Sequence, residues 1–463
     1  MSLSRACARA SRKPSRLLGE VITVTSGLRA THPSPSVSRR PLASAGGGEG
    51  AMLVSRLAPR LASRSAVLAA LLCASAPRDR HEEWMLHALH LAERGRLSTA
   101  PNPWVGCVFV AADGETVVAE GYHVQKGAPH AEAAALLDAQ RRGVSDQLAD
   151  CTCYVTLEPC HRGPGKTTPP CDEAIVTCGV RSVHVALLDP DPTFGNAGVS
   201  YLKSCGIEVV VGTGAAAVAA SLRPYLHQRR MLSPWIVLKV AASADGAIAC
   251  ADGSSQWITG ERARAHSQLL RASSQAIIVG SGTAVKDEPR LTVRLGAGSL
   301  PTNWLPPARA PLRVVLDASG RLVRGPLLDT TDAPTLICTT AAAPQSRIDA
   351  WKSAGAEVAV MPRASGASGG VDLDAVLVEL GRRGVIQAMV EGGGALLGSF
   401  LASKRAQELQ LYLGACVLGS TSTRWINAPL ASSIDQATRF KVLGQPEVLG
   451  EDICIRYSLQ DVE

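Results

Sequence analysis

The sequence predicts an α/β protein in which a basic leader precedes two successive sheet domains. The chain has 463 residues, which is too long for one typical hydrophobic core. Downstream of the leader, short β-branched runs alternate with segments of helical periodicity, as in sheets flanked by helices. Apolar residues make up 46% of the chain and charged residues 19%, which indicates a globular protein. We expect a leader over 1–78, domains over 79–222 and 234–463, and a linker over 223–233.

The leader accounts for the positive charge of the chain. It holds 12 of the 47 Lys and Arg residues but two of the 40 acids, so residues 79–463 carry a net charge of −3. A slightly acidic body lacks the basic surface of a nucleic-acid binder. The leader is rich in Arg, Ser, Ala and Pro and poor in acids, which is typical of a disordered organelle transit peptide. We expect a plastid location, with the mitochondrion as the alternative.

Neither a membrane span nor secretion is expected. The apolar run at 65–76 is too short to cross a bilayer. The thirteen cysteines are an odd number scattered among apolar residues, which favours a reducing compartment over a secreted, disulfide-bonded protein.

Periodicity places the elements of both domains. In the first, Asp113-Gly114 forms a turn between two strands, and helices and strands then alternate. The expected elements are a helix through 85–92, strands at 105–111 and 116–120, a helix at 130–141, a strand at 153–157, a helix at 172–178, and strands at 182–187 and 207–211. In the second, parallel strands are expected at 236–242, 276–279, 313–316, 335–338, 357–361 and 388–390, with helices at 260–272 and 373–381 and a mobile loop at 364–370.

Four residues from two segments form the strongest chemical signature. His130 and Glu132 begin a predicted helix in PHAEAAAL, Cys160 follows a predicted strand in LEPC, and Cys171 precedes a helix in TPPC. One imidazole and two thiolates leave the fourth position of a tetrahedral Zn²⁺ open for water, which is the catalytic arrangement. His-x-Glu followed by Pro-Cys and a second Cys is typical of zinc deaminases, in which the Glu moves the proton. We expect one Zn²⁺ per chain and Glu132 as the catalytic acid and base.

Longer motifs extend this match. APNPWVGCV, GYHVQKGAPHAEAAAL and VTLEPCHRGPGKTTPPCDEAIVTCGV, within about residues 81–213, resemble the deaminase half of the bifunctional riboflavin biosynthesis deaminase/reductase family. The resemblance implies a cytidine-deaminase-like domain, with a mixed sheet and flanking helices, and a phosphorylated pyrimidine as substrate. It also implies that Asn102 and His123 face the pyrimidine and its ribose phosphate, and that Lys166 faces the phosphate. Ten residues separate Cys160 from Cys171, more than in the usual family pattern, so the loop that carries Lys166 is altered.

The second domain resembles the reductase half of the same family. PWIVLKVAASADGAIA, the stretch from GSSQWITGERARAHSQLLRASS to RLTVR, and VEGGGALLGSFL carry this resemblance, which implies a dihydrofolate-reductase-like α/β fold and NADPH as cofactor. Glycines between a strand and a helix, as in the run that begins at Glu391, let backbone N–H groups approach a phosphate. The implied NADPH contacts are Ala241, Trp257, Thr283, Asp287, Gly393, Gly394, Ala395, Leu396, Leu397, Gly398 and Ser399. The implied substrate contacts are Ser255, Arg271, Leu291, Arg294 and Glu391.

These patterns together predict a bifunctional enzyme. The expected steps are zinc-dependent hydrolytic deamination of a diaminopyrimidine ribosylamino 5-phosphate and then NADPH-dependent reduction of the ribosyl to a ribityl side chain. The altered cysteine loop leaves a monofunctional relative as the alternative. A nucleic-acid deaminase would need a basic body, and a metal-stabilised scaffold would keep its function in Glu132→Ala. Whether the chain forms a homo-oligomer is left open.

Overall fold

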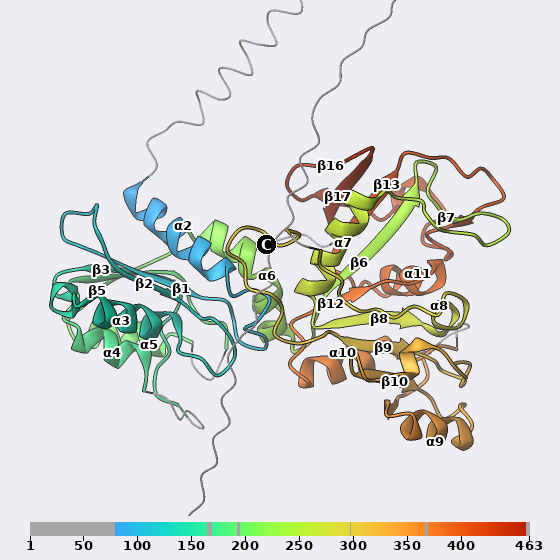
Figure 1. Cartoon of the computed structure of the whole chain (residues 1–463), viewed down its shortest axis with the longest axis horizontal. Helices are drawn as coiled ribbons and strands as arrows, with labels where there is room; N and C mark the ends of the chain where they lie inside the picture. Colours follow the sequence, from blue (N-terminus) through green and yellow to red (C-terminus); the bar gives the residue numbers. More distant parts are fainter. Residues whose placement is uncertain (1–78, 164–168, 192–194, 297, 366–368, 460–463) are drawn as a thin grey trace, which may run out of the picture. The chain divides into compact units, whose positions relative to one another are not determined.

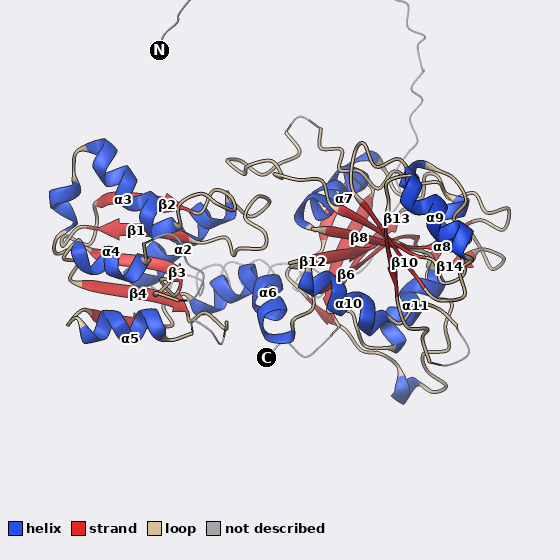
Figure 2. Cartoon of the chain, turned by 90° about the horizontal axis from the view of Figure 1, so that it is seen from below, coloured by secondary structure: helices blue, strands red, loops and turns tan. Residues whose placement is uncertain are grey.

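A computed structural model of the chain describes residues 79–463, apart from 164–168, 192–194, 297, 366–368 and 460–463 (Figure 1). The leader at 1–78 therefore lies outside the described residues, as do Lys166 and part of the loop expected at 364–370. The predicted α/β class is confirmed, because each of two sheets has helices packed on it (Figure 2). Within the described ranges, no helix combines the length and apolar character needed to cross a membrane.

The first sheet lies within the predicted first domain. Its elements are α2 (Arg80–Glu93), β1 (Gly106–Val110), β2 (Val117–Tyr122), α3 (Ala131–Arg142), the 3-10 turn η1 (Ser145–Leu148), β3 (Thr152–Leu157), α4 (Cys171–Thr177), β4 (Ser182–Leu187), α5 (Ala197–Ser204), β5 (Glu208–Val211) and α6 (Ala215–Met231). The strand order is β2-β1-β3-β4-β5. β2, β1 and β3 pair antiparallel, whereas β3, β4 and β5 pair parallel, so the sheet is mixed as predicted. Parallel strands need crossover connections, which α4 and α5 supply.

Helices cover both faces of this sheet. β1 is buried along its whole length. Cys107 and Phe109 pack on one face with Ala135 of α3, and Val108 packs on the other face with Met85 of α2. Successive side chains of a strand point to opposite faces, so a strand covered on both sides must be apolar throughout. This double cover holds the ends of β3 and α3 in place, and these ends carry the predicted zinc ligands.

The second sheet lies within the predicted second domain. Its elements are β6 (Trp235–Ser243), β7 (Ala247–Ala249), α7 (Glu261–Ser273), β8 (Ala276–Gly280), α8 (Ser281–Lys286), β9 (Leu312–Leu316), η2 (Pro326–Leu328), β10 (Thr335–Thr339), α9 (Gln345–Ser353), β11 (Glu357–Val360), α10 (Leu373–Arg382), β12 (Gln387–Val390), α11 (Gly394–Ala402), β13 (Glu408–Gly414), β14 (Thr423–Arg424), η3 (Ile434–Gln436), β15 (Lys441–Val442), β16 (Glu447–Leu449) and β17 (Asp452–Ser458). The strand order is β11-β10-β9-β8-β12-β6-β13-β17-β15, with β16 also paired to β17 and β7 paired to β14.

The predicted parallel strands form the body of this sheet. Every pairing from β11 to β13 is parallel. The antiparallel pairings of β17 with β13, β15 and β16 were not predicted. Ile278 of β8 packs in the core on one face, and its neighbours Ile277 and Val279 pack on the other. In Figure 2 the strands fan out because the sheet twists.

The segment predicted as a linker is largely helical. α6 continues to Met231 and contains Pro224 in its interior. A proline there removes a hydrogen bond and costs about 3 kcal/mol. Val218, Leu222 and Leu226, at i, i+4 and i+8, bury one side of the helix and offset this cost. Pro224 therefore does not interrupt the helix, and the boundary between the two domains stays a prediction.

Candidate functional site

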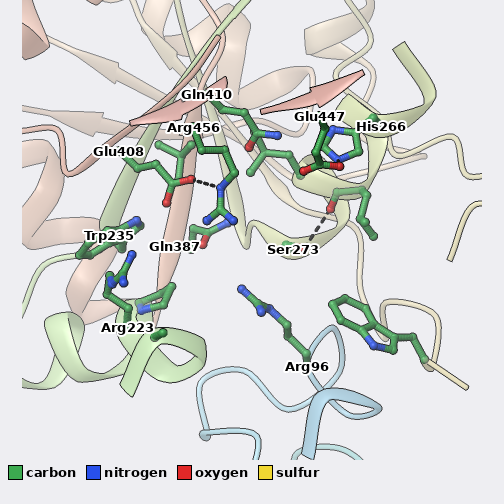
Figure 3. Close-up of a pocket in the computed structure, with 16 residues that line it drawn as sticks. Arg96, Arg223, Trp235, His266, Ser273, Gln387, Glu408, Gln410, Glu447 and Arg456 are labelled. Carbon is green, nitrogen blue, oxygen red and sulfur yellow. Dashed lines mark hydrogen bonds and ion pairs between the residues drawn. The ribbon is translucent and has the colours of Figure 1, made fainter. Parts of the chain in front are cut away.

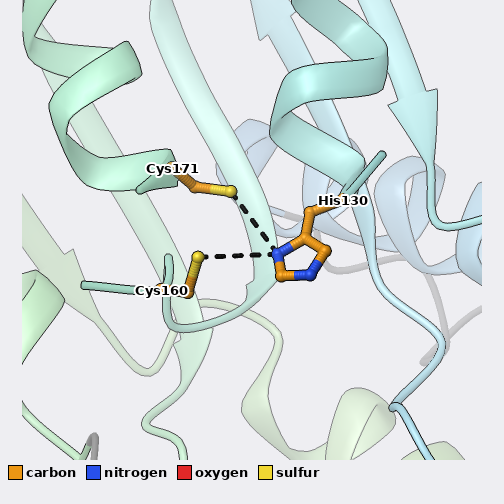
Figure 4. A group of neighbouring side chains, drawn as sticks. All are labelled: His130, Cys160 and Cys171. Atoms are coloured by element: carbon orange, nitrogen blue, oxygen red, sulfur yellow. Dashed lines mark hydrogen bonds between the residues drawn. The ribbon is translucent and has the colours of Figure 1, made fainter. Parts of the chain in front are cut away.

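The three predicted zinc ligands converge from the ends of three elements. His130 precedes α3, Cys160 lies three residues after β3, and Cys171 is the first residue of α4. The backbone N–H of Cys171 donates to the carbonyl of Cys160 at 3.1 Å, which holds the two cysteines together. Figure 4 shows the three side chains pointing toward one another. Their ligand atoms all lie within 4.8 Å of one another.

The spacing of these atoms fits a zinc tetrahedron. The Nδ1 atom of His130 lies 3.5 Å from the Sγ of Cys160 and 3.6 Å from the Sγ of Cys171. Zinc–sulfur bonds of about 2.3 Å and zinc–nitrogen bonds of about 2.05 Å at the tetrahedral angle give an N···S edge of about 3.6 Å. The donor set therefore matches Zn²⁺ in both chemistry and size, with Nδ1 as the histidine ligand.

One of the two cysteines of the triad ionises much more readily than the other. The hydrogen bond with Cys171, together with that from His130, lowers the pKa of Cys160 to about 3 despite its burial. The same bond, with burial, raises the pKa of Cys171. Zinc binds thiolates rather than thiols, so a pair in which one sulfur ionises readily favours binding.

Glu132 is placed beside this triad in the first turn of α3. Its side chain is 3% exposed and lines the same cavity as His130 and Cys160. Burial and then the negative charge of Cys160 raise the pKa of Glu132 to about 7. A carboxylate whose pKa is near neutral can both accept and release a proton, as an acid–base catalyst must.

Asn102 and His123 both line this cavity, and their contacts with the substrate stay a prediction. His123 donates from Nδ1 to the carbonyl of Pro129 at 2.9 Å, and its Nε2 lies 3.2 Å from the side-chain nitrogen of Asn102. Burial, and then the charge of His130, lower the pKa of His123. The imidazole is therefore neutral, with the proton on Nδ1 and Nε2 accepting from the amide of Asn102. This pair fixes the orientation of two polar groups on the cavity wall.

The cavity contains further polar residues that the sequence prediction missed. It has a volume of about 370 Å³. Asp189 and Asp191 follow β4, and Tyr225 and Arg229 come from α6. The motif DPDP directly after a predicted strand was the available signal for the two aspartates. Nothing in the local sequence of α6 marks the other two residues.

A second cavity, of about 290 Å³, contains much of the predicted reductase site. Of the predicted residues, Ala241, Ser255, Trp257, Thr283, Asp287, Glu391, Gly393 and Leu397 line it. The hydroxyl of Thr283 in α8 accepts from the backbone N–H of Gly393 at 3.2 Å, which joins the helix after β8 to the turn after β12. A Cβ on Gly393 would meet nothing closer than the Thr283 hydroxyl at 3.9 Å. This open backbone at the start of α11 fits the phosphate of a nucleotide cofactor.

Glu391 connects two cations at this cavity. Arg271 donates to it from Nη2 at 2.6 Å and from Nε at 3.1 Å, and Lys239 donates at 3.3 Å. Burial alone would raise the pKa of Glu391, but the charges of Lys239 and Arg271 overcome burial and hold it at about 2. Lys239 also lines the cavity and was missed from the sequence, because a lysine in an apolar strand has no local signal.

Other predicted reductase residues do not line this cavity. They are Arg271, Leu291, Arg294, Gly394, Ala395, Leu396, Gly398 and Ser399. A Cβ on Gly394 would come 2.9 Å from the carbonyl oxygen of Arg424, and one on Gly398 would come 2.6 Å from the Cβ of Ala428. Close packing thus explains both glycines without a cofactor. Their contacts with NADPH stay a prediction, as does the role of the exposed Arg294.

A third cavity, of about 170 Å³, contains no predicted site residue (Figure 3). Most of its charged groups have ionic partners within the protein. Arg456 donates to Glu408 at 2.7 Å, and His266 lies 3.5 Å from Glu447. Arg96 pairs with Glu93 at 3.3 Å. These pairs account for much of its charge.

Known proteins match the chain along both domains. A family profile described as "Cytidine and deoxycytidylate deaminase zinc-binding region" matches residues 78–187, and one described as "RibD C-terminal domain" matches 234–454. The riboflavin biosynthesis protein RibD of Chlamydia trachomatis is 42% identical over 338 residues, which cover 73% of this chain and 84% of that protein. RibD of Escherichia coli is 36% identical over 378 residues, covering 81% of this chain and 98% of that protein.

Solved structures agree with the sequence matches. Acinetobacter baumannii RibD, form 1, is 34% identical with a TM-score of 0.71, and the match covers 82% of this chain and 98% of that one. A deaminase/reductase from Thermotoga maritima is 30% identical with a TM-score of 0.68 and the same coverage. Fold and site together define a zinc-dependent deaminase domain followed by a reductase domain. The chain belongs to the RibD family of riboflavin biosynthesis proteins.

Proposed function

We propose that this chain catalyses two consecutive reactions on a phosphorylated pyrimidine. In the first, water replaces the exocyclic amine of a diaminopyrimidine ribosylamino 5-phosphate and ammonia leaves. In the second, NADPH reduces the ribosyl side chain of the resulting aminouracil to a ribityl chain. The observation that carries the proposal is the triad of His130, Cys160 and Cys171, with the buried Glu132 lining the same cavity as His130 and Cys160.

In the first reaction, protein groups move the proton and orient the ring. Zinc, when bound by the triad, supplies a water of lowered pKa. Glu132 accepts a proton at a carboxylate oxygen and returns it to the exocyclic nitrogen, which leaves as ammonia. The Asn102 amide and the neutral His123 present fixed polar atoms to the substrate. Lys166 stays the predicted phosphate contact, and the guanidinium of Arg229 adds a cation to the described cavity wall.

In the second reaction, the protein positions two bound molecules. NADPH, when bound, supplies the hydride. The backbone of Gly393 and the hydroxyl of Thr283 form the phosphate-facing turn, and Trp257 offers an exposed ring at the same cavity. The carboxylate of Glu391 accepts hydrogen bonds from Lys239, which lines the cavity, and from Arg271, which does not, and so fixes both cations. Holding both reactants in a reactive geometry lowers the barrier by several kcal/mol.

Separate half-reaction assays of the full chain test both activities. With the diaminopyrimidine alone, we expect ammonia release without a need for NADPH. With the aminouracil and NADPH, we expect NADPH oxidation at one equivalent per substrate. The monofunctional alternative predicts that one of these two signals is absent. Because the triad is complete and both cavities are formed, we expect both signals.

We also propose that residues 1–78 direct the chain to the plastid, with the mitochondrion as the alternative. The support is their net charge of +10 and their scarcity of acids. Fusing these residues to a fluorescent protein tests the proposal, and fluorescence confined to the cytosol would contradict it. The net charge of −3 on the rest of the chain supports a small-molecule substrate over a nucleic acid. Size measurement in solution decides whether the enzyme is a homo-oligomer.

A further inference from the structure

The carboxylate of Glu158 binds three backbone N–H groups of one distant segment. Glu158 follows the end of β3, two residues before Cys160, and is 7% exposed. One oxygen, Oε2, accepts from the N–H of Asp189 at 3.2 Å and of Asn196 at 2.9 Å. The other oxygen, Oε1, accepts from the N–H of Val199 at 3.1 Å. Both oxygens of this buried carboxylate therefore accept from the backbone of Asp189 and of the residues at the start of α5.

Two of these bonds cap helix α5 from outside the helix. The first N–H groups of a helix have no partner inside it. Asn196, the residue before α5, has a φ of 65° and its side chain makes no capping bond. Glu158 replaces this cap, because it accepts from Asn196 and from Val199 in the first turn. A carboxylate at this end also interacts favourably with the helix dipole.

The start of α5 packs closely against Pro159, the residue after Glu158. A Cβ on Gly198 would lie 2.0 Å from the carbonyl oxygen of Pro159, so only glycine fits. Glu158 and Pro159 thus form one docking point for α5, and this point is immediately followed by the zinc ligand Cys160. The positions of Asp189 and of the start of α5 are therefore set from the same strand end that positions the metal ligand.

The same segment carries part of the cavity wall. Asp189 and Asp191 both line the zinc cavity, and the N–H of Asp191 donates to the carboxylate of Asp189 at 3.0 Å. The hydroxyl of Tyr225 donates to the Asp189 carboxylate at 3.4 Å. The place of these carboxylates depends on the backbone of Asp189, which Glu158 holds.

We propose that Glu158 is a positioning residue that fixes the substrate-facing wall of the deaminase cavity through three backbone N–H groups. Glu158 lines the cavity itself, but both of its carboxylate oxygens accept backbone N–H groups, so it acts through Asp189 and the start of α5. The proposal rests on the proposed deaminase function, and it assigns Glu158 to substrate binding rather than to zinc binding or proton transfer.

Glu158→Gln in the full, zinc-loaded chain tests this role. Glutamine offers one acceptor oxygen instead of two, so at least one of the three backbone N–H groups loses its partner. The NH2 group of glutamine, which is itself a donor, then faces that backbone N–H. We expect the deaminase KM to rise at least five-fold while kcat, zinc content and the reductase kinetics stay within two-fold of wild type. The control is Glu208→Gln, which removes an exposed carboxylate from β5 of the same sheet, and we expect no change in any of these values.

Amide hydrogen exchange provides a measurement that does not depend on activity. In Glu158→Gln we expect at least one of the amides of Asp189, Asn196 and Val199 to exchange at least ten-fold faster, with no change in α3 or α4. An unchanged KM, unchanged exchange at these amides, loss of zinc together with kcat, or loss of protection throughout 79–222 would each overturn the proposal. Failure of the wild-type chain to release ammonia would instead remove the proposed function, and the exchange measurement would still test the contact.

Discussion

Replacing Glu391 with glutamine should destabilise the reductase domain in a pH-dependent way. The variant leaves Lys239 and Arg271 beside each other without a neutralising charge. Holding the pKa of Glu391 at about 2 instead of the ordinary 4.5 corresponds to about 3 kcal/mol of folding free energy at neutral pH. Its side chain is 21% exposed, so solvent screening reduces the expected loss to about 2 kcal/mol.

The sign of the pH dependence follows from the lowered pKa. The ionised carboxylate stabilises the folded state, so its contribution is complete above the unfolded pKa and is lost as the pH falls toward the folded pKa of about 2. The difference in unfolding free energy between wild type and Glu391→Gln should therefore be largest near neutral pH and shrink below about pH 4.5.

Urea unfolding followed by tryptophan fluorescence measures this difference. A loss of about 2 kcal/mol with a urea dependence of about 2 kcal/mol per molar lowers the midpoint by about 1 M. The matched control is Glu288→Gln, because Glu288 pairs with Arg324 on the surface at 3.5 Å, and it should cost less than about 0.5 kcal/mol. Equal losses in the two variants, or a Glu391→Gln deficit that is the same at pH 7 and pH 3, would refute the reasoning.

Two further predictions concern the cofactor turn and the first sheet. Thr283→Val removes the hydroxyl that accepts from Gly393, so the KM for NADPH should rise about five-fold with kcat within two-fold in steady-state assays; an unchanged KM would contradict the assigned turn. Burial, and then the charge of His81, lower the pKa of His184 to about 4, so the neutral imidazole stabilises the fold above about pH 6.5 and this contribution is lost as the pH falls toward 4. Over this range, the unfolding free energy of wild type should fall by up to about 1 kcal/mol per pH unit more than that of His184→Gln. Chemical denaturation at several pH values measures this difference, and unfolding free energies that fall in parallel for the two proteins would exclude the effect.

The zinc site was predictable because its signals are local. His130 with Glu132, Cys160 and Cys171 each stand next to the end of an element whose periodicity is clear in the sequence. Parallel strand ends and helix starts meet at one edge of a sheet, so short motifs were enough to bring these side chains together. The glycine turn that begins at Glu391 also lies at a strand end, where the structure places it at a cavity, and its contact with the cofactor stays a prediction.

Residues that act through distant contacts were not predictable. Lys239 and Tyr225 look like ordinary members of a strand and a helix, and their roles appear only when the fold brings them to a cavity. The segment 223–233 was expected to be a linker, but it is largely helical because burial of the apolar side of α6 outweighs the cost of Pro224. At Gly394 and Gly398 close packing accounts for glycine by itself, so the presence of glycine there does not show a cofactor contact.

The zinc content of the purified chain tests the central claim most directly. It is measured by inductively coupled plasma mass spectrometry for wild type, Cys171→Ser and Glu132→Gln. We expect one zinc per wild-type chain, less than one fifth of that in Cys171→Ser, and a full equivalent in Glu132→Gln combined with at least a hundred-fold loss of ammonia release. A wild-type chain that releases ammonia without zinc, or a Glu132→Gln variant that deaminates at the wild-type rate, would contradict it.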